Sequence, residues 1–138
     1  MRKQFIHIRY TLVTILLLGI AFSSCEKSET NIKTPFEGSI TLNVHCIHHS
    51  WDVPYMSVFL KRNATVYPGP DTSLYDIRLQ GDGYGNVAFG NLIPGDYYIL
   101  AKGYDPIWGD SAIGYKWVNL IKENLTNNQM SVTLYVSE

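Results

Sequence analysis

The densest group of side chains that could bind a metal lies at residues 45–49, where three histidines and one cysteine fall within five positions. Imidazole and thiolate are ligands that Zn²⁺ prefers. In an extended strand His45 and His49 would lie about 13 Å apart on one face, too far to share one ion bound at about 2 Å. We expect His48 and His49 to begin a loop as exposed polar residues, with metal binding in that loop as the less favoured alternative. The sequence therefore predicts no metal and no cofactor.

No arrangement of residues typical of an enzyme is found in the sequence. The nucleophile motif Gly-x-Ser-x-Gly and the zinc motif His-Glu-x-x-His are both missing. The segment 82–86 loosely resembles a calcium-binding loop, but Tyr84 stands where an oxygen ligand belongs, so a turn explains it better. We therefore predict a protein that is not an enzyme.

Aromatic side chains in predicted loops are the main candidates for ligand binding. Their flat rings suit either a sugar face or the centre of a protein interface. The alternative is that several of them pack over the ends of the domain. The candidate ligand-binding residues are Trp51, Tyr55, Tyr84 and Trp108, Tyr104 is a further loop aromatic, and Phe59 and Tyr98 fall on outward strand positions.

The first 24 residues have the three parts of a secretory signal. Three basic residues precede an apolar run, Thr11–Phe22, and small residues follow it. The run is too short for a membrane-spanning helix, which needs about 20 apolar residues. The tetrad that ends at Cys25, Phe-Ser-Ser-Cys, resembles the bacterial lipobox, and its Ser-Ser-Cys ending resembles lipoproteins of Bacteroidota.

This resemblance implies that Cys25 carries a diacylglycerol thioether and an acylated amine. Two or more acyl chains anchor a protein stably without crossing the membrane. If Cys25 were not lipidated, a disulfide between Cys25 and Cys46 would become possible. A second, short resemblance concerns Asp110-Ser111-Ala112, which is similar to the O-glycosylation sequon of Bacteroidota and implies a glycan on Ser111 in an accessible loop, 108–114.

The segment after Cys25 has the composition of a flexible tether. Residues 26–35 (EKSETNIKTP) are polar, carry charges of both signs and lack an apolar period. Cleavage of the signal leaves eight basic against twelve acidic side chains, a net charge near −4. This balance argues against nucleic acid as a partner.

From residue 38 onward, apolar residues alternate with polar ones at the period of a β-strand. Tight-turn residues separate the runs, notably at 81–86 and at Pro94-Gly95. Cys46 shares a face with Leu42 and Val44, so we expect a buried side chain. Seven short strands with this spacing predict an all-β fold, a Greek-key β-sandwich. The predicted strands cover residues 40–46, 56–60, 75–80, 87–89, 97–101, 115–121 and 130–136.

The stretch 82–101 is similar to a motif of carboxypeptidase regulatory-like domains, which are transthyretin-like sandwiches. The matching residues are a turn glycine (Gly85), two inward apolar residues (Phe89 and Leu92), and Pro94-Gly95 ahead of Tyr97. The resemblance implies a transthyretin-like or immunoglobulin-like topology. All of these residues build the fold, and fold alone names no function.

Together these patterns predict a signal peptide (1–24), a lipidated Cys25 with its tether (25–36) and one sandwich domain (37–138). The expected function is a non-enzymatic, lipid-anchored accessory module of an envelope assembly, at the outer membrane or cell surface. A location facing the periplasm stays open. Two alternatives remain: a carbohydrate-binding module that uses the loop aromatics, and a self-associating structural or adhesin-like protein. The partners would be the membrane and either a protein or a glycan.

Overall fold

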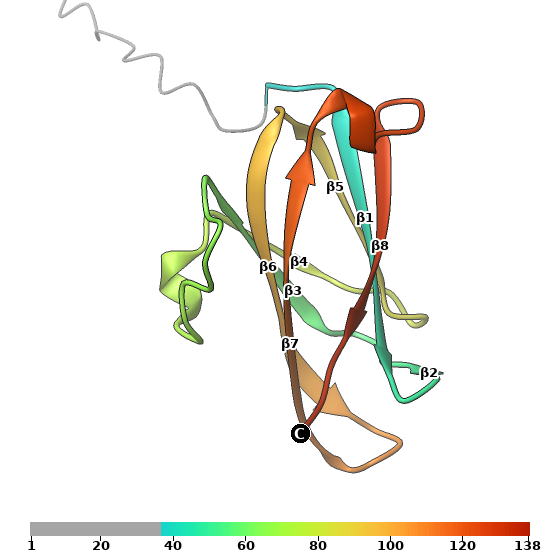
Figure 1. The fold of residues 1–138 in the computed structure, drawn as a ribbon. Helices are drawn as coiled ribbons and strands as arrows, with labels where there is room; N and C mark the ends of the chain where they lie inside the picture. Colours follow the sequence, from blue (N-terminus) through green and yellow to red (C-terminus); the bar gives the residue numbers. More distant parts are fainter. Residues whose placement is uncertain (1–36) are drawn as a thin grey trace, which may run out of the picture. The chain divides into compact units, whose positions relative to one another are not determined.

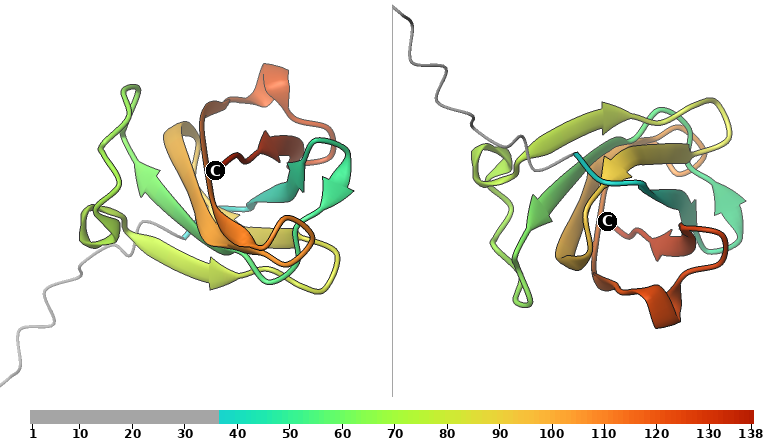
Figure 2. Two further views of the ribbon diagram at one scale, coloured as in Figure 1. Left: turned by 90° about the horizontal axis from the view of Figure 1, so that it is seen from below. Right: turned by 90° about the horizontal axis from the view of Figure 1, so that it is seen from above.

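The computed structural model describes residues 37–138. The predicted signal peptide, Cys25 and the tether lie outside the described residues. Two β-sheets pack face to face and enclose one core, as Figure 1 and the two end-on views of Figure 2 show. In the part of the chain that is described, neither three-residue 3-10 helix is long enough to span a membrane.

The strands divide evenly between the two sheets. In the first sheet β1 lies at the centre and pairs with three strands; β8 runs parallel to it, whereas β2 and β5 are antiparallel. The second sheet is antiparallel, in the order β4-β3-β6-β7. The first sheet contains β1 (Ile40–His48), β2 (Trp51–Asp52), β5 (Asn86–Leu92) and β8 (Gln129–Tyr135). The second contains β3 (Ser57–Arg62), β4 (Ile77–Gln80), β6 (Gly95–Asp105) and β7 (Asp110–Leu120), and the 3-10 helices are η1 (Thr72–Leu74) and η2 (Lys122–Asn124).

The chain changes sheets between β2 and β3, β4 and β5, β5 and β6, and β7 and β8. The predicted all-β sandwich is therefore confirmed. The alternation of β1 also holds: Leu42, Val44 and Cys46 are at most 1% exposed and face the other sheet. The two largest side chains of the core come one from each sheet: Phe89 from β5 of the first sheet and Tyr97 from β6 of the second.

The turn and core residues of the motif at 82–101 take the places expected of them. Gly85 has φ +73°, and a Cβ there would lie 2.7 Å from the carbonyl oxygen of Cys46. Phe89 and Leu92 are buried in the core. The Tyr97 hydroxyl donates a hydrogen bond to the carbonyl of Ile93, 2.8 Å away, and so holds the β5–β6 turn.

Two predicted boundaries are wrong. The third strand begins at Ile77 rather than Tyr75, because the Asp71 side chain caps η1 and Tyr75 ends that turn. The predicted loop 108–114 is mostly strand: β6 and β7 form a long hairpin whose pairing extends to the pair Asp105 and Asp110. Ser111 is therefore a strand residue, although it is exposed as expected.

The sandwich has two distinct ends. Residue 37 and the start of β1 lie at one end, and the β1–β2 turn and the β6–β7 turn lie at the other (Figure 1). The nine residues of β1 span roughly 27 Å between them at about 3.4 Å per residue. We call the end far from residue 37 the tip, formed by the loops 49–55, 81–85 and 105–109.

Candidate binding surfaces

All four aromatic residues predicted to bind a ligand are exposed at or beside the tip. Their exposed fractions are 61% for Trp51, 66% for Tyr55, 71% for Tyr84 and 51% for Trp108. Tyr104 is also exposed, at 61%. The three tip loops contain no Lys or Arg.

Tyr55 and Tyr84 are positioned by one turn, which Asp82 organises. The Tyr55 backbone N–H donates to the Asp82 carbonyl (3.0 Å), and the Tyr84 N–H donates to the Asp82 carboxylate (2.9 Å). The Asn86 N–H makes a second bond to that carboxylate at 2.8 Å. The backbone hydrogen bonds from Asn86 and Tyr84 lower the pKa of Asp82, because they favour its charged form.

Trp108 belongs to a different group at the tip, in which it packs against two histidines. Its ring centroid lies 5.0 Å from that of His49 and 5.7 Å from that of His48. The two imidazoles stack on each other at 4.4 Å. Among the described residues, no ring contact joins Trp108 to Trp51 or to Tyr55. The structure therefore places the four predicted residues at one end without assembling them into a single site.

His48 was expected to be exposed in a loop, and this expectation is wrong. It is the last residue of β1, only 3% exposed, and it continues the inward-facing row of that strand. Its Nδ1 lies 2.8 Å from Oδ2 of Asp105, which is also buried. A buried polar side chain needs such a partner, since an unpaired one is costly. The pair joins the end of β1 to the β6–β7 hairpin.

Asp105 also fixes the turn that carries Trp108. Its Oδ1 accepts hydrogen bonds from the backbone N–H of Ile107 (2.9 Å) and from that of Trp108 (3.4 Å). Burial acts to raise the pKa of Asp105, but the hydrogen bonds from His48, Ile107 and Trp108, with the electrostatic effect of His48, outweigh it and lower the pKa. The carboxylate thus holds the hairpin in its ionised form.

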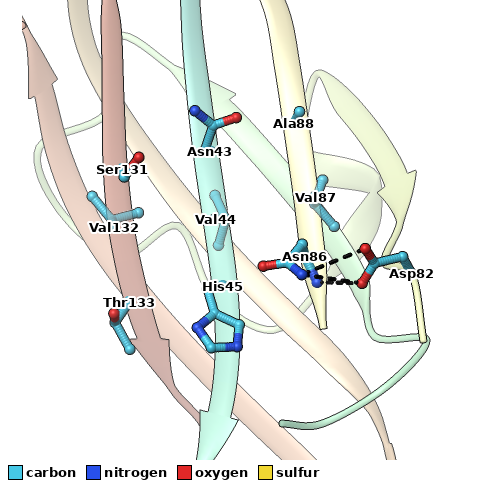
Figure 3. A pocket seen from close by; sticks show the side chains of 10 residues that line it. All are labelled: Asn43, Val44, His45, Asp82, Asn86, Val87, Ala88, Ser131, Val132 and Thr133. Carbon is cyan, nitrogen blue, oxygen red and sulfur yellow. Dashed lines mark hydrogen bonds between the residues drawn. The ribbon is translucent and has the colours of Figure 1, made fainter. Parts of the chain in front are cut away.

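A shallow polar groove, which the sequence analysis missed, runs over the outer face of the first sheet (Figure 3). It has a volume of about 560 Å³ and is open to solvent. The outward residues of three adjacent strands line it, and Asp82 borders one side. They are Asn43 and His45 from β1, Asn86 and Ala88 from β5, and Ser131 and Thr133 from β8. Alternation along each strand marks these residues as outward, but only the sheet order brings them together.

A second patch that sequence reasoning did not identify covers the outer face of the second sheet. Tyr67, from the β3–β4 loop, stacks on Tyr115 with ring centroids 4.4 Å apart and lies 5.8 Å from Tyr98. We call these three the tyrosine cluster. Phe59 was expected to be exposed on this face but is only 8% exposed, because Tyr75 of the same loop and the Arg78 guanidinium pack over its ring. The patch therefore holds a long loop against the sheet.

Residues 37–138 contain neither an activated cysteine nor a cluster of metal ligands. Burial raises the pKa of the Cys46 thiol to about 12, so it is protonated at neutral pH. His45 is not part of a metal cluster; its Nε2 lies 2.9 Å from Oδ1 of Asp52. No three His, Cys, Asp or Glu side chains in this range come close enough together to hold a metal ion.

The sequence matches no known protein family, and no curated protein is significantly similar to it. Seven chains of solved structures are significantly similar to this protein, and three of them illustrate the range. The major pilin subunit of Bacillus cereus has 14% identity and a TM-score of 0.49 over 73% of this chain. A Pseudomonas aeruginosa protein described as a candidate carbohydrate-binding protein has 15% identity and a TM-score of 0.50 over 72% of this chain. The pilus adhesin of Streptococcus pneumoniae has 13% identity and a TM-score of 0.38 over 73%.

The fraction of the other protein that aligns with this chain differs widely among the three. The chain spans 30% of the pilin subunit and 15% of the adhesin, but 90% of the Pseudomonas protein. At such low identity, the likeness to the Pseudomonas protein establishes a shared β-sandwich fold.

Proposed function

We propose that this protein is a non-enzymatic binding module, held at a bacterial envelope by a lipid on Cys25 and acting as an accessory subunit of a surface assembly. One observation carries the proposal: the exposed loop aromatics lie at the end of the sandwich opposite residue 37. A tether at residues 25–36 would join the domain at residue 37, so the tip would be the end of the domain farthest from the point of attachment. Exposed tyrosine and tryptophan side chains in number are typical of binding surfaces.

The lipid anchor gives the first expected outcome. Cys25→Ser removes the acceptor thiol, so the variant should leave the membrane fraction, whereas the native chain should sediment with membranes and carry the mass of its acyl chains. The matched control is Cys46→Ala, which removes the buried thiol and should stay membrane-bound. Membrane attachment of the Cys25→Ser variant would contradict the anchor.

A partner at the tip gives the second expected outcome. A photo-cross-linking amino acid at Tyr104, which is 61% exposed in the tip hairpin, should capture a discrete protein in intact source cells. The same amino acid at Tyr115, which is 55% exposed on the outer face of the second sheet, is the matched control. The adduct should fall by about tenfold or more in the Trp51→Ala/Trp108→Ala variant, because an aromatic hot-spot residue contributes about 2 kcal/mol.

This experiment separates the accessory role from its alternatives. Equal capture from Tyr104 and Tyr115, or no adduct at Tyr104 although the photo-cross-linking amino acid is incorporated there efficiently, would contradict a tip partner. The expression level and the melting temperature of the Trp51→Ala/Trp108→Ala variant are first compared with those of the native chain, so that unfolding is not mistaken for lost binding.

Carbohydrate binding through the loop aromatics is the second candidate function. It is supported by exposed indole rings in loops that contain no cation, and by the fold shared with a protein described as a candidate carbohydrate-binding protein. In that case glycan affinity would depend on Trp51 and Trp108. Saccharide binding by the Trp51→Ala and Trp108→Ala single variants, compared with the native chain, tests this candidate.

Self-association by strand pairing is disfavoured by one side chain. β7 is an edge strand of the second sheet, and Lys116 occupies one of its inward-facing positions, between Gly114 and Val118. Its Nζ donates to the Thr133 carbonyl across the gap to β8, 3.2 Å away. An inward-pointing lysine on an edge strand opposes pairing with another chain. We therefore do not expect the proposed module to assemble through this edge.

A further inference from the structure

We infer that the groove on the outer face of the first sheet, between β8, β1 and β5, binds a neutral polyhydroxylated ligand, a saccharide residue. The groove borders the tip at Asp82, but its lining contains none of the four exposed aromatic residues predicted to bind a ligand, so the inference does not depend on the protein partner proposed above. Most of the outward side chains that line the groove are polar. Its volume of about 560 Å³ falls in the range of small-ligand sites.

The charges around the groove limit what it can hold. None of its lining residues is Lys or Arg, so an anionic ligand would find no counter-charge. Asp82 is the acidic residue of the lining, and its oxygens already accept hydrogen bonds from Tyr84 and Asn86. A cation would therefore compete with the bonds that hold the turn. A neutral ligand meets neither obstacle.

Some polar side chains of the groove are oriented by hydrogen bonds to neighbouring residues, and others have no hydrogen-bond partner among residues 37–138. His45 is oriented by Asp52, and the Asn86 amide nitrogen lies 3.4 Å from each Asp82 oxygen, which leaves the Asn86 amide oxygen directed toward the groove (Figure 3). The side chains of Asn43, Ser131 and Thr133 make no hydrogen bond with any other residue among 37–138. An apolar ligand would strip water from these groups without replacing its hydrogen bonds, which is unfavourable.

The spacing of these groups suits a sugar ring. Asn43 pairs in register with Ser131 on one side and Ala88 on the other, and His45 pairs with Thr133 and Asn86. These rows form a grid of roughly 5 by 7 Å, set by strand separation and by alternate residues along a strand. Hydroxyl groups that both donate and accept, arranged around one ring, can engage several points of such a grid. The short Ala88 and Ser131 side chains leave room for the ring.

An aromatic side chain flanks the groove on the same face. Tyr135 follows Thr133 by two residues on β8, pairs with Ile47 of β1, and is 67% exposed. Its ring is available to stack on the apolar face of a sugar whose hydroxyls occupy the groove. Tyr135 thus lies next along the strand from the polar lining residue Thr133, where a flat aromatic face can add to the polar groups of the groove.

The test uses the purified full chain in a detergent without a sugar head group. Saturation-transfer NMR with neutral hexoses, N-acetylhexosamines and their disaccharides should detect binding. In Asn43→Ala/Ser131→Ala and in Tyr135→Ala the dissociation constant should rise roughly tenfold, and Ser131→Leu should abolish binding by filling the groove. Ser73→Leu, an exposed serine in η1 on the β3–β4 connection, is the matched control and should bind as the native chain does. Melting temperatures confirm that all variants are folded.

The outcomes distinguish this site from the other proposals. Native affinity in all three groove variants would overturn the inference, and loss of binding in Trp51→Ala or Trp108→Ala instead would place the saccharide at the tip. No binding by any neutral saccharide of the panel would overturn both carbohydrate sites. It would leave the protein partner, which the cross-linking experiment tests separately.

Discussion

Replacing Asp105 by alanine should lower the free energy of unfolding by about 3 kcal/mol, because it leaves the buried His48 without its partner. Both side chains are at most 3% exposed, and the Nδ1–Oδ2 distance is 2.8 Å. The change also removes the acceptor for the N–H groups of Ile107 and Trp108. For a domain of about 100 residues, this loss corresponds to a fall in melting temperature of roughly 12–20 °C. Thermal and urea unfolding measure it.

Asp110→Ala is the matched control for this substitution. Asp110 lies in the same hairpin but is exposed, and its carboxylate accepts a bond from the N–H of Ser111. Removal of an exposed carboxylate should change stability by no more than about 0.5 kcal/mol. The double variant His48→Leu/Asp105→Leu should be less destabilised than Asp105→Ala, since it leaves no unpaired buried group. Equal stability of the Asp105→Ala and Asp110→Ala proteins would show that the buried pair does not hold the tip.

The same pair predicts a pH dependence. The pKa of Asp105 lies below its ordinary value of about 3.9, so its ionised form stabilises the folded state. That contribution is fully present above the ordinary pKa and is lost as the pH falls through the lower folded value. The native protein should therefore lose stability on acidification below about pH 4. The Asp105→Ala variant should show a shallower loss in the same range.

Replacing Gly85 by alanine should lower the free energy of unfolding by about 2–4 kcal/mol, for a different reason. The φ of +73° costs an L-residue about 1–2 kcal/mol. The added Cβ would also lie 2.7 Å from the carbonyl oxygen of Cys46 and 2.9 Å from that of Val53. Neither backbone group can move without disturbing β1, because the Cys46 N–H donates to the Gly85 carbonyl and the Val53 N–H to the Cys46 carbonyl.

Gly90→Ala tests whether the effect belongs to the position rather than to glycine. Gly90 lies in β5, with negative φ, and a Cβ there would have no neighbour within 4 Å. Alanine at this site should leave stability unchanged or raise it slightly, since glycine weakens a strand. Chemical denaturation of both variants gives the comparison. A Gly85→Ala protein as stable as the Gly90→Ala protein would contradict the role of the turn glycine.

The core could be predicted from the sequence because it depends on local alternation. In β1 every second residue from Ile40 to Cys46 is apolar, and a strand turns every second side chain to the same face. The turn residues of the 82–101 segment are similarly local, since Gly85 and Gly95 adopt positive φ within their own turns. Such features need no knowledge of distant residues, and the sandwich fold follows from them.

The burial of His48 shows where this reasoning fails. Alternation along β1 already directed its side chain inward, but a polar residue at a strand end reads as exposed unless a partner is known. That partner, Asp105, is 57 residues away. It reaches His48 because the β6–β7 hairpin ends beside the last residue of β1. A charge that is buried by tertiary pairing leaves no mark in the residues next to it.

The groove depends still more on tertiary structure. Asn43, Ala88 and Ser131 are each recognisable as outward strand residues, yet nothing in their order predicts that β1 pairs with both β5 and β8. The register of those pairs places the three side chains in one row. The chain sequence thus determines which side chains leave the core. Strand order and register, which result from burying both sheets together, decide which of them meet and what they can bind.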